Sequence, residues 1–199
     1  MGRRSDHSRE ELEAFILEEG HRHMAESGFA KFSSREVAKR IGYSVGTLYN
    51  VFGSYDRLVA AINTRTFDLW AAFLEQRLAG DPQDRIAALV EGYFSFAQEN
   101  PNIWMAIYDH RLPPGVPMPE DYARQRGRLT EVVVREVAAV LPPDGREGAP
   151  RLARSLVATV HGHCTFALNG SFALLGETDP LEMATARVKE SLIAAGAKL

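Results

Sequence analysis

The sequence predicts an all-α protein with about nine helices. Three observations support this fold class: apolar residues recur at helical spacing along most of the 199 residues, capping patterns precede these runs, and glycine or proline breaks separate them. No segment shows the alternation of period two that a half-exposed strand requires. We expect a small three-helix head over residues 1–54 and a larger helical body over residues 55–199.

Capping patterns place the first two helices of the head. Ser8 with Glu11 forms a capping box, in which the serine hydroxyl and the glutamate carboxylate each accept a backbone N–H. An amphipathic run follows and ends at Gly28, which suits a helix terminus. Ser33 with Glu36 repeats the capping pattern, so a short second helix is expected there.

A glycine turn joins the second helix to a third. Gly42 suits the left-handed backbone conformation that closes a helix, and Ser44 can cap the helix that follows it. Two short helices joined in this way have the layout of a helix-turn-helix, whose second helix enters the major groove of DNA. Ser54 then starts a long fourth helix that extends to about Leu78.

Prolines and glycines divide the body. Pro82 suits the first position of a fifth helix, Pro101 that of a sixth, and Pro180 that of a ninth, which Asp179 caps. Residues 112–119 predict an irregular loop, and residues 144–148 a flexible link. Between these breaks we expect the fifth helix to reach about residue 99, a seventh over about 120–141 and an eighth over about 151–175.

The composition is that of an ordinary soluble protein, with 45% hydrophobic and 25% charged residues. No uncharged apolar stretch of 18 residues is present, and the N-terminal segment lacks the apolar region of a secretory signal. Cys164 is the single cysteine, which excludes an intrachain disulfide framework and fits a reducing compartment. We therefore expect a cytoplasmic protein without a membrane span.

The charge is unevenly distributed. A net charge of −3 does not by itself indicate a nucleic-acid binder. Residues 8–27 hold two arginines and six glutamates, whereas residues 28–57 hold five basic residues against two acidic ones, and Arg3 and Arg4 add further positive charge. The positive field is therefore local to the expected helix-turn-helix, as phosphate contact requires.

The candidate DNA contacts lie mainly at the starts of the second and third helices. Free backbone N–H groups and the positive end of the helix dipole attract phosphate there, and small polar side chains allow close approach to base edges. The expected contact set is Ser33, Ser34, Arg35, Lys39, Tyr43, Ser44, Val45, Gly46, Thr47, Tyr49, Asn50 and Tyr55. On spacing alone, an ordinary helix pair without a ligand is an equal alternative.

The run from Phe32 to Leu58 resembles the DNA-binding domain of TetR/AcrR-type transcriptional regulators. The matching elements are Gly28-Phe29, the segment VAKRIGYSVGTLY, Phe52, Asp56 and Leu58, and the resemblance covers about residues 8–60. It implies an all-α homodimer whose three N-terminal helices bind DNA and whose C-terminal body binds a small effector and dimerises. It also implies a repressor that the effector releases from its operator.

Two positions depart from the pattern of this family. Many members carry His where Val51 stands and Lys where Tyr55 stands, so charged phosphate contacts do not carry over to these positions, whereas Ser44, Thr47 and Tyr49 do match. The body resembles one C-terminal branch of the family more loosely, through Asn100-Pro101 and His161-Gly162.

A small-molecule site is expected in the body. Aromatic, methionine and histidine residues concentrate between 93 and 122 and again between 161 and 172. A pocket lined by apolar groups with a few polar ones is the usual form of such a site, although aromatic residues at helical spacing are most often core. The expected lining set is Phe96, Trp104, Tyr108, Tyr122, His161 and Asn169.

His161, His163 and Cys164 support alternative functions. His161 and Cys164 share a helix face, and imidazole with thiolate would suit a zinc or copper sensor. Two ligands on one helix do not complete a site, so a buried histidine bonded to a neighbouring helix is the simpler interpretation, and we expect no cofactor or metal. A helical enzyme is the other alternative, but no G-x-S-x-G, phosphate-binding loop or dinucleotide glycine pattern accompanies these residues.

The last two expected helices predict a dimer interface. The eighth is apolar around much of its circumference between residues 156 and 175, so it is covered on more than one side. Two-fold packing of both helices would place two heads in successive major grooves, about 34–36 Å apart. The expected interface residues are Leu156, Phe172, Leu181, Ala184, Val188 and Leu192, and a helix buried within one chain is the alternative.

These features together predict a sequence-specific DNA-binding transcriptional regulator. We expect a repressor that binds a double-stranded DNA operator as a homodimer and is released by a small-molecule effector. The competing classes are a helical enzyme, a metal-responsive sensor and a helical adaptor that does not bind DNA. The intact segment from Ser44 to Tyr49 argues against the adaptor.

Overall fold

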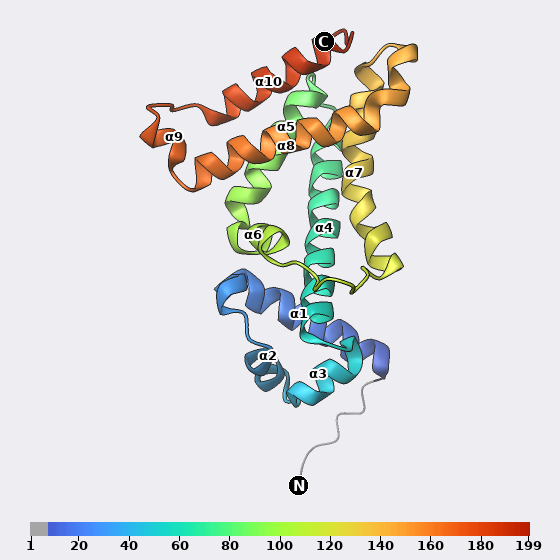
Figure 1. Ribbon diagram of the computed structural model, residues 1–199, viewed down its shortest axis with the longest axis vertical. Helices are drawn as coiled ribbons and strands as arrows, with labels where there is room; N and C mark the ends of the chain where they lie inside the picture. Colours follow the sequence, from blue (N-terminus) through green and yellow to red (C-terminus); the bar gives the residue numbers. More distant parts are fainter. Residues whose placement is uncertain (1–7) are drawn as a thin grey trace. The chain divides into compact units, whose positions relative to one another are not determined.

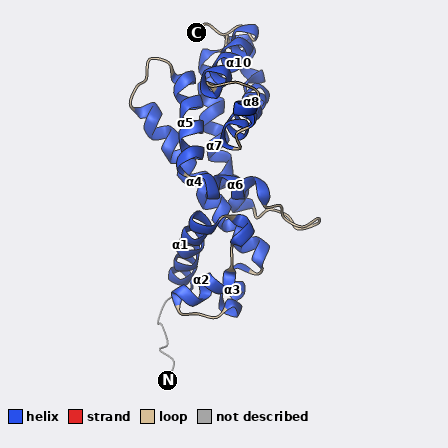
Figure 2. Ribbon diagram, turned by 90° about the vertical axis from the view of Figure 1, so that its left-hand side faces the viewer, coloured by secondary structure: helices blue, strands red, loops and turns tan. Residues whose placement is uncertain are grey.

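The computed structural model describes residues 8–199, and every regular element in this range is a helix (Figure 2). Arg3 and Arg4 lie outside the described residues. The all-α fold class is confirmed, and none of the described helices is long and apolar enough to cross a membrane. The α-helices are α1 (Arg9–Ser27), α2 (Ser34–Ile41), α3 (Val45–Phe52), α4 (Tyr55–Ala79), α5 (Arg85–Glu99), α6 (Pro101–Asp109), α7 (Glu120–Val140), α8 (Ala149–Leu168), α9 (Ser171–Leu174) and α10 (Pro180–Ala194), and the 3-10 helices are η1 (Phe29–Lys31) and η2 (Pro143–Gly148).

The described chain divides into two compact units. Unit 1 comprises the described residues up to Phe67 together with Asn100–Gln125, and unit 2 comprises Asp68–Glu99 and Arg126–Leu199. Helix α4 contributes residues to both units, and α6 belongs to unit 1. The expected boundary after residue 54 separates a DNA-binding head from a ligand-binding body, and the division into compact units does not test it. It stays a prediction.

Local capping and a shared core form unit 1. The Ser8 hydroxyl accepts the Glu11 backbone N–H at 3.2 Å and the Glu11 carboxylate accepts the Ser8 N–H at 2.7 Å, so the expected capping box is present. The buried core unites helices α1 to α4 with α6, which contributes Ile103 and Ala106. Burial of a side chain as large as that of Ile103 stabilises the fold by about 1.5–3 kcal/mol.

Unit 2 is a packed group of helices in which α8 and α10 lie side by side (Figure 1, orange and red). Arg85 of α5 donates from Nε and Nη2 to the two carboxylate oxygens of Glu136 in α7, at 2.7 and 3.0 Å. This two-point ion pair, assisted by burial of the carboxylate at 4% exposure, joins α5 to α7. The bonds from Arg85, followed by those from Arg135, hold the pKa of Glu136 below its usual range.

Three expected boundaries in the body were wrong. Helix α5 begins at Arg85 rather than at Pro82, because Asp84 accepts the Ala87 N–H at 2.8 Å and caps the helix there. The expected eighth helix is interrupted after Leu168, because Gly170 takes a left-handed conformation with φ of 78° and separates α8 from α9. Residues 143–148 form η2 rather than a flexible link.

Candidate nucleic-acid interface

Helix α2 is capped at both ends, but the capping box expected at Ser33 and Glu36 is only half formed, because the Ser33 N–H donates to His23 Nε2 and the Glu36 carboxylate accepts from Arg40 instead. At its start, the Ser33 hydroxyl accepts the Glu36 N–H at 3.3 Å. At its end, Gly42 has φ of 76°, and the N–H groups of Gly42 and Tyr43 donate to the carbonyls of Lys39 and Ala38 at 3.2 and 2.9 Å. These two bonds form a Schellman motif, which fixes the direction in which the chain enters α3.

The first turn of α3 presents a pair of hydroxyl groups. The Ser44 hydroxyl accepts the Thr47 N–H at 3.1 Å and lies 3.0 Å from the Thr47 hydroxyl. Ser44, Gly46 and Asn50 are exposed, whereas Leu48 and Phe52 of the same helix are buried. One face of α3 is thus anchored in the core while the other offers small polar groups, as direct contact with base edges requires.

The remaining members of the expected contact set differ in how far they are exposed to solvent. Arg35 and Lys39 are exposed, and Ser33, Tyr43, Val45, Thr47, Tyr49 and Tyr55 are partly buried. Tyr55 packs against Phe32 with ring centroids 6.1 Å apart, and burial raises its pKa. Ser34 is buried at 5% exposure, and its hydroxyl has no hydrogen-bond partner among the described residues. The structure therefore leaves Ser34 without an accessible hydroxyl at the start of α2.

Arg40 is paired with three carboxylates of the same chain, so it does not add a free cation to the surface. Its Nη1 donates to Glu26 at 2.7 Å and to Glu19 at 3.2 Å, and its Nε donates to Glu36 at 3.4 Å. Glu19 is 4% exposed, so Arg40 neutralises a buried carboxylate of α1. The hydrogen bond to Glu26, then that to Glu19, raises the pKa of Arg40. Sequence reasoning missed this role because the three carboxylates come from two helices.

Four exposed cations lie on α2 or in the elements that precede α2 and follow α3 in the sequence. Lys31, Arg35, Lys39 and Arg57 are exposed and form no ion pair within the part of the chain that the structure describes. Unpaired lysine and arginine side chains displace counterions from DNA when they contact phosphate, and this release supplies a large share of the affinity in protein–DNA complexes. The local positive patch therefore remains even when Arg40 is not counted as part of it.

Helix α6 is bonded to the helices that carry the motif. The Asn102 amide donates to the Ala25 carbonyl of α1 at 2.7 Å, and the buried Asn63 amide of α4 donates to the Ala106 carbonyl at 3.0 Å. His110, just after α6, lies 3.2 Å from the Asp56 carboxylate at the start of α4. Hydrogen bonds are specific in geometry, and the one from Asn63 is buried, so α6 is held within unit 1 by directional bonds as well as by apolar packing.

The expected ligand-lining residues fall in both units. In unit 1, Trp104 is fully buried and packs edge to face on Tyr108 with centroids 5.3 Å apart, and Tyr122 lies beside the core. In unit 2, Phe96 stacks on Trp70 at 5.0 Å, and Asn169 is exposed at the end of α8.

His161 of α8 is partnered as the sequence suggested for a buried histidine. Its Nδ1 lies 3.0 Å from the Tyr93 hydroxyl of α5, and burial lowers its pKa. Cys164 is fully buried, which raises the pKa of its thiol to about 12 and leaves it protonated at neutral pH. Within residues 8–199, no three His, Cys, Asp or Glu side chains lie close enough together to hold a metal ion.

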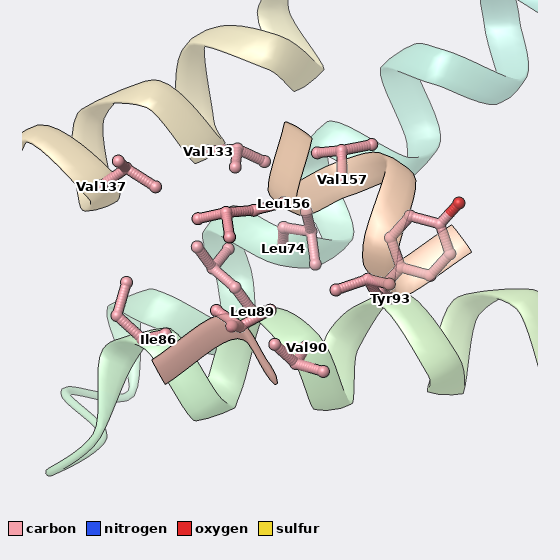
Figure 3. Close-up of a pocket in the computed structure, with 11 residues that line it drawn as sticks. Leu74, Ile86, Leu89, Val90, Tyr93, Val133, Val137, Leu156 and Val157 are labelled. Carbon is pink, nitrogen blue, oxygen red and sulfur yellow. The ribbon is translucent and has the colours of Figure 1, made fainter. Parts of the chain in front are cut away.

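Unit 2 contains an apolar cavity that sequence reasoning missed (Figure 3). It has about 430 Å³ of empty space, counting the part open to solvent. Its lining consists of Leu74, Ile86, Leu89, Val90, Tyr93, Val133, Val137, Leu156, Val157, Val160 and Val188. None of the six expected lining residues takes part. The available signal was the spacing of valines by three or four residues on α7 and α8.

The expected dimer residues are mostly interior in the single chain. Leu156, Phe172, Ala184, Val188 and Leu192 are each no more than 9% exposed, and Leu181 is partly buried. The same region leaves other apolar side chains in solvent, with exposures from 40% to 90%: Phe166, Leu168, Leu174, Leu175 and Ile193. These five side chains are the candidates in this region for contact with a second chain.

Comparison with protein families identifies both parts of the chain. Residues 16–62 match the model described as bacterial regulatory proteins, tetR family, and residues 86–190 match the model described as tetracyclin repressor-like, C-terminal domain. The first match covers the helix-turn-helix and the second covers most of unit 2.

Curated relatives and solved structures agree with these matches. The chain is 28% identical over 137 residues to the HTH-type transcriptional regulator Rv1816 of Mycobacterium tuberculosis, which covers 67% of this chain and 57% of that protein. It is 28% identical over 160 residues to the regulator BetI of Burkholderia ambifaria, covering 77% and 80%. A Rhodococcus sp. RHA1 protein of unknown function shares the fold over the whole of both chains, with a TM-score of 0.72 and 23% identity. The multidrug binding protein EbrR, solved with imidazole, has a TM-score of 0.62 at 20% identity, covering 94% of this chain and 96% of EbrR.

Proposed function

Because this chain belongs to the TetR family of bacterial transcriptional regulators, we propose that it controls transcription by binding a double-stranded DNA operator. It acts in the cytoplasm as a homodimer and represses its target until a small-molecule effector releases it. The family is one of regulators rather than enzymes, so the enzyme alternative at His161 and Cys164 is set aside. The metal-sensor alternative has no complete ligand set within residues 8–199.

The observation that carries this proposal is the arrangement of the first turn of α3. Ser44 and Thr47 hold their hydroxyls 3.0 Å apart at the exposed N-terminal end of the helix, next to Gly46, which lets DNA approach closely. Exposed Arg35 and Lys39 lie on the preceding helix, where they can neutralise phosphates. The proposed contacts are Ser33, Arg35, Lys39, Tyr43, Ser44, Val45, Gly46, Thr47, Tyr49, Asn50 and Tyr55, with Ser34 contributing through its backbone N–H alone.

Effector release requires two states that the effector distinguishes. Helix α4 is the proposed transmission element, because Asp56 and Asn63 at one end bond to residues of unit 1 while Trp70 and Leu74 at the other end pack in unit 2. An effector that favours one state of unit 2 then reduces the fraction of chains whose heads fit the operator.

The DNA proposal is tested by fluorescence anisotropy with the region upstream of the gene at 50 and 200 mM salt. Binding should weaken steeply at the higher salt, because each neutralised phosphate contributes a slope of about −0.9 in log K against log salt concentration. Lys39→Ala should reduce that slope by about 1, and Arg151→Ala, an exposed arginine of α8, should leave it unchanged. No binding to any upstream fragment at 50 mM salt would favour the adaptor alternative.

A further inference from the structure

The cavity of unit 2 has an unusual chemical character for a site that recognises a ligand. Six of its lining residues are valines, contributed by α5, α7, α8 and α10, and the others are leucine, isoleucine and one tyrosine. Not one lining residue carries an ionisable group that is charged at neutral pH. Small-molecule sites commonly combine an apolar lining with several polar groups that orient the ligand.

The one polar side chain in the lining is already engaged. The Tyr93 hydroxyl lies 3.0 Å from His161 Nδ1, and Figure 3 shows this oxygen directed away from the other labelled side chains. The Tyr93 ring also packs edge to face on Trp70, with centroids 4.7 Å apart, which fixes its orientation. Tyr93 therefore presents ring carbon to the cavity rather than its hydroxyl.

The size of the side chains decides how closely the helices around the cavity approach and what space they leave between them. A methyl group at Gly92 of α5 would come within 2.6 Å of Leu74 Cδ2, so α4 and α5 approach through a glycine and direct Leu74 to the lining. Val133 and Val137 reach the cavity from α7, one helical turn apart. Short branched side chains at these positions leave space that longer ones would fill.

We propose that this cavity binds a small, uncharged, apolar molecule, such as an aromatic or aliphatic hydrocarbon or its halide, and excludes charged compounds. The inference rests on the proposed function, for which it names the chemical class of the effector. A charged or strongly polar ligand would lose its hydration in a site that offers no partner for the charge. An apolar molecule has no comparable desolvation penalty and gains contacts with the side chains that line the cavity.

The test uses fluorobenzene and its charged counterpart 4-fluorobenzoate, with binding to the full chain followed by ¹⁹F NMR in the absence of DNA. Fluorobenzene should bind, and 4-fluorobenzoate should bind at least ten-fold more weakly. Val133→Phe fills the cavity and should abolish fluorobenzene binding, whereas Val134→Phe, on the same helix and outside the lining, should retain it. Val157→Phe fills the cavity from α8 and covers the case in which Val133→Phe does not fold.

Three results would overturn the inference: no fluorobenzene binding, equal binding of the two compounds, or unchanged binding in both filling variants. Operator binding is measured separately on the same preparations. Probe binding without operator binding leaves the cavity assignment in place and contradicts the proposed function. Operator binding without fluorobenzene binding supports the proposed function and contradicts the cavity assignment.

Discussion

The Nε2 atom of His23 in α1 accepts a hydrogen bond of 3.2 Å from the backbone N–H of Ser33, the N-cap residue of α2. Since Nε2 is the acceptor, the proton of the neutral ring resides on Nδ1, which is buried without a partner among the described residues. Burial, followed by the charge of Arg40, lowers the pKa of His23, while Glu26, Glu36 and Glu19 oppose that shift. The start of α2 is thus positioned by an imidazole that functions only when neutral.

Two replacements of His23 should distinguish the contribution of this hydrogen bond to stability from that of side-chain packing. His23→Leu leaves the Ser33 N–H without its acceptor and should lower the free energy of unfolding by about 1–3 kcal/mol. His23→Gln supplies a carbonyl oxygen and should recover part of the loss. Urea unfolding of both variants measures the difference, and equal stabilities for the two would contradict a role for the bond.

Stability of the chain should decrease as pH falls from about 6.5 toward 4. Burial, then Arg65, lowers the pKa of His21 to about 4, and the pKa of His23 is also lowered. An unfolded histidine has a pKa of about 6.5, so the unfolded state binds more protons in this range and is favoured by acid. For His21 the loss between pH 7.5 and 5 is about 2 kcal/mol.

His21→Gln isolates that contribution, because glutamine does not titrate. Its stability should fall less steeply with pH than that of the wild type, with His23 supplying part of what remains. Denaturant unfolding at pH 7.5 and 5 gives both values. A wild-type stability that stays constant or rises on acidification is incompatible with the prediction.

Arg40 and Arg35 should affect different properties. Arg40→Ala leaves the buried carboxylate of Glu19 without one of its partners, so the urea midpoint should fall. The salt dependence of DNA binding should stay unchanged in this variant. Arg35→Ala should do the opposite, with a salt slope reduced by about 1 and an unchanged midpoint. If Arg40→Ala reduced the slope as much as Arg35→Ala, Arg40 would be a phosphate contact after all.

Gly42 should resist substitution for a conformational reason alone. A Cβ placed there meets nothing within 4 Å, but φ is 76°, so alanine should cost about 1–2 kcal/mol through its backbone. Asparagine tolerates this conformation better and should cost less. Gly148 is the matched control, because it has a φ of −77° and equally open surroundings. Thermal or urea unfolding of Gly42→Ala and Gly148→Ala compares them directly, and equal losses would exclude a conformational cause.

The exposed apolar side chains of α8 and α10 should be required for dimerisation. Phe166 is 46% and Ile193 59% exposed, and the double change Phe166→Glu with Ile193→Glu should shift a dimer to a monomer in size exclusion with light scattering. Leu69→Glu on α4, at 43% exposure, is the control and should remain dimeric. A wild-type monomer at micromolar concentration would exclude the dimer.

Local signals predicted the helices of the head accurately. Ser8, Ser33 and Ser44 cap helices and Gly42 ends one, because these functions depend on residues within one turn. Roles that depend on residues far apart in the chain could not be predicted from the sequence. Arg40 was counted as a surface cation because its carboxylate partners Glu19 and Glu26 come from another helix, and the interior placement of Leu192 could not be distinguished from an interface by periodicity.

The composition of unit 1 has a consequence for exchanging domains between regulators of this fold. Residues 8–54 alone are not a transplantable module, because Asn102 bonds α6 to α1, Asn63 bonds α4 to α6, and His110 pairs with Asp56. A chimera that carries a foreign head should therefore also import residues 100–125. The head and residues 100–125 are separate segments of the sequence, so a single crossover cannot transfer both. Under the proposed function, operator preference then changes more easily by point substitutions on α3 than by exchange of whole heads.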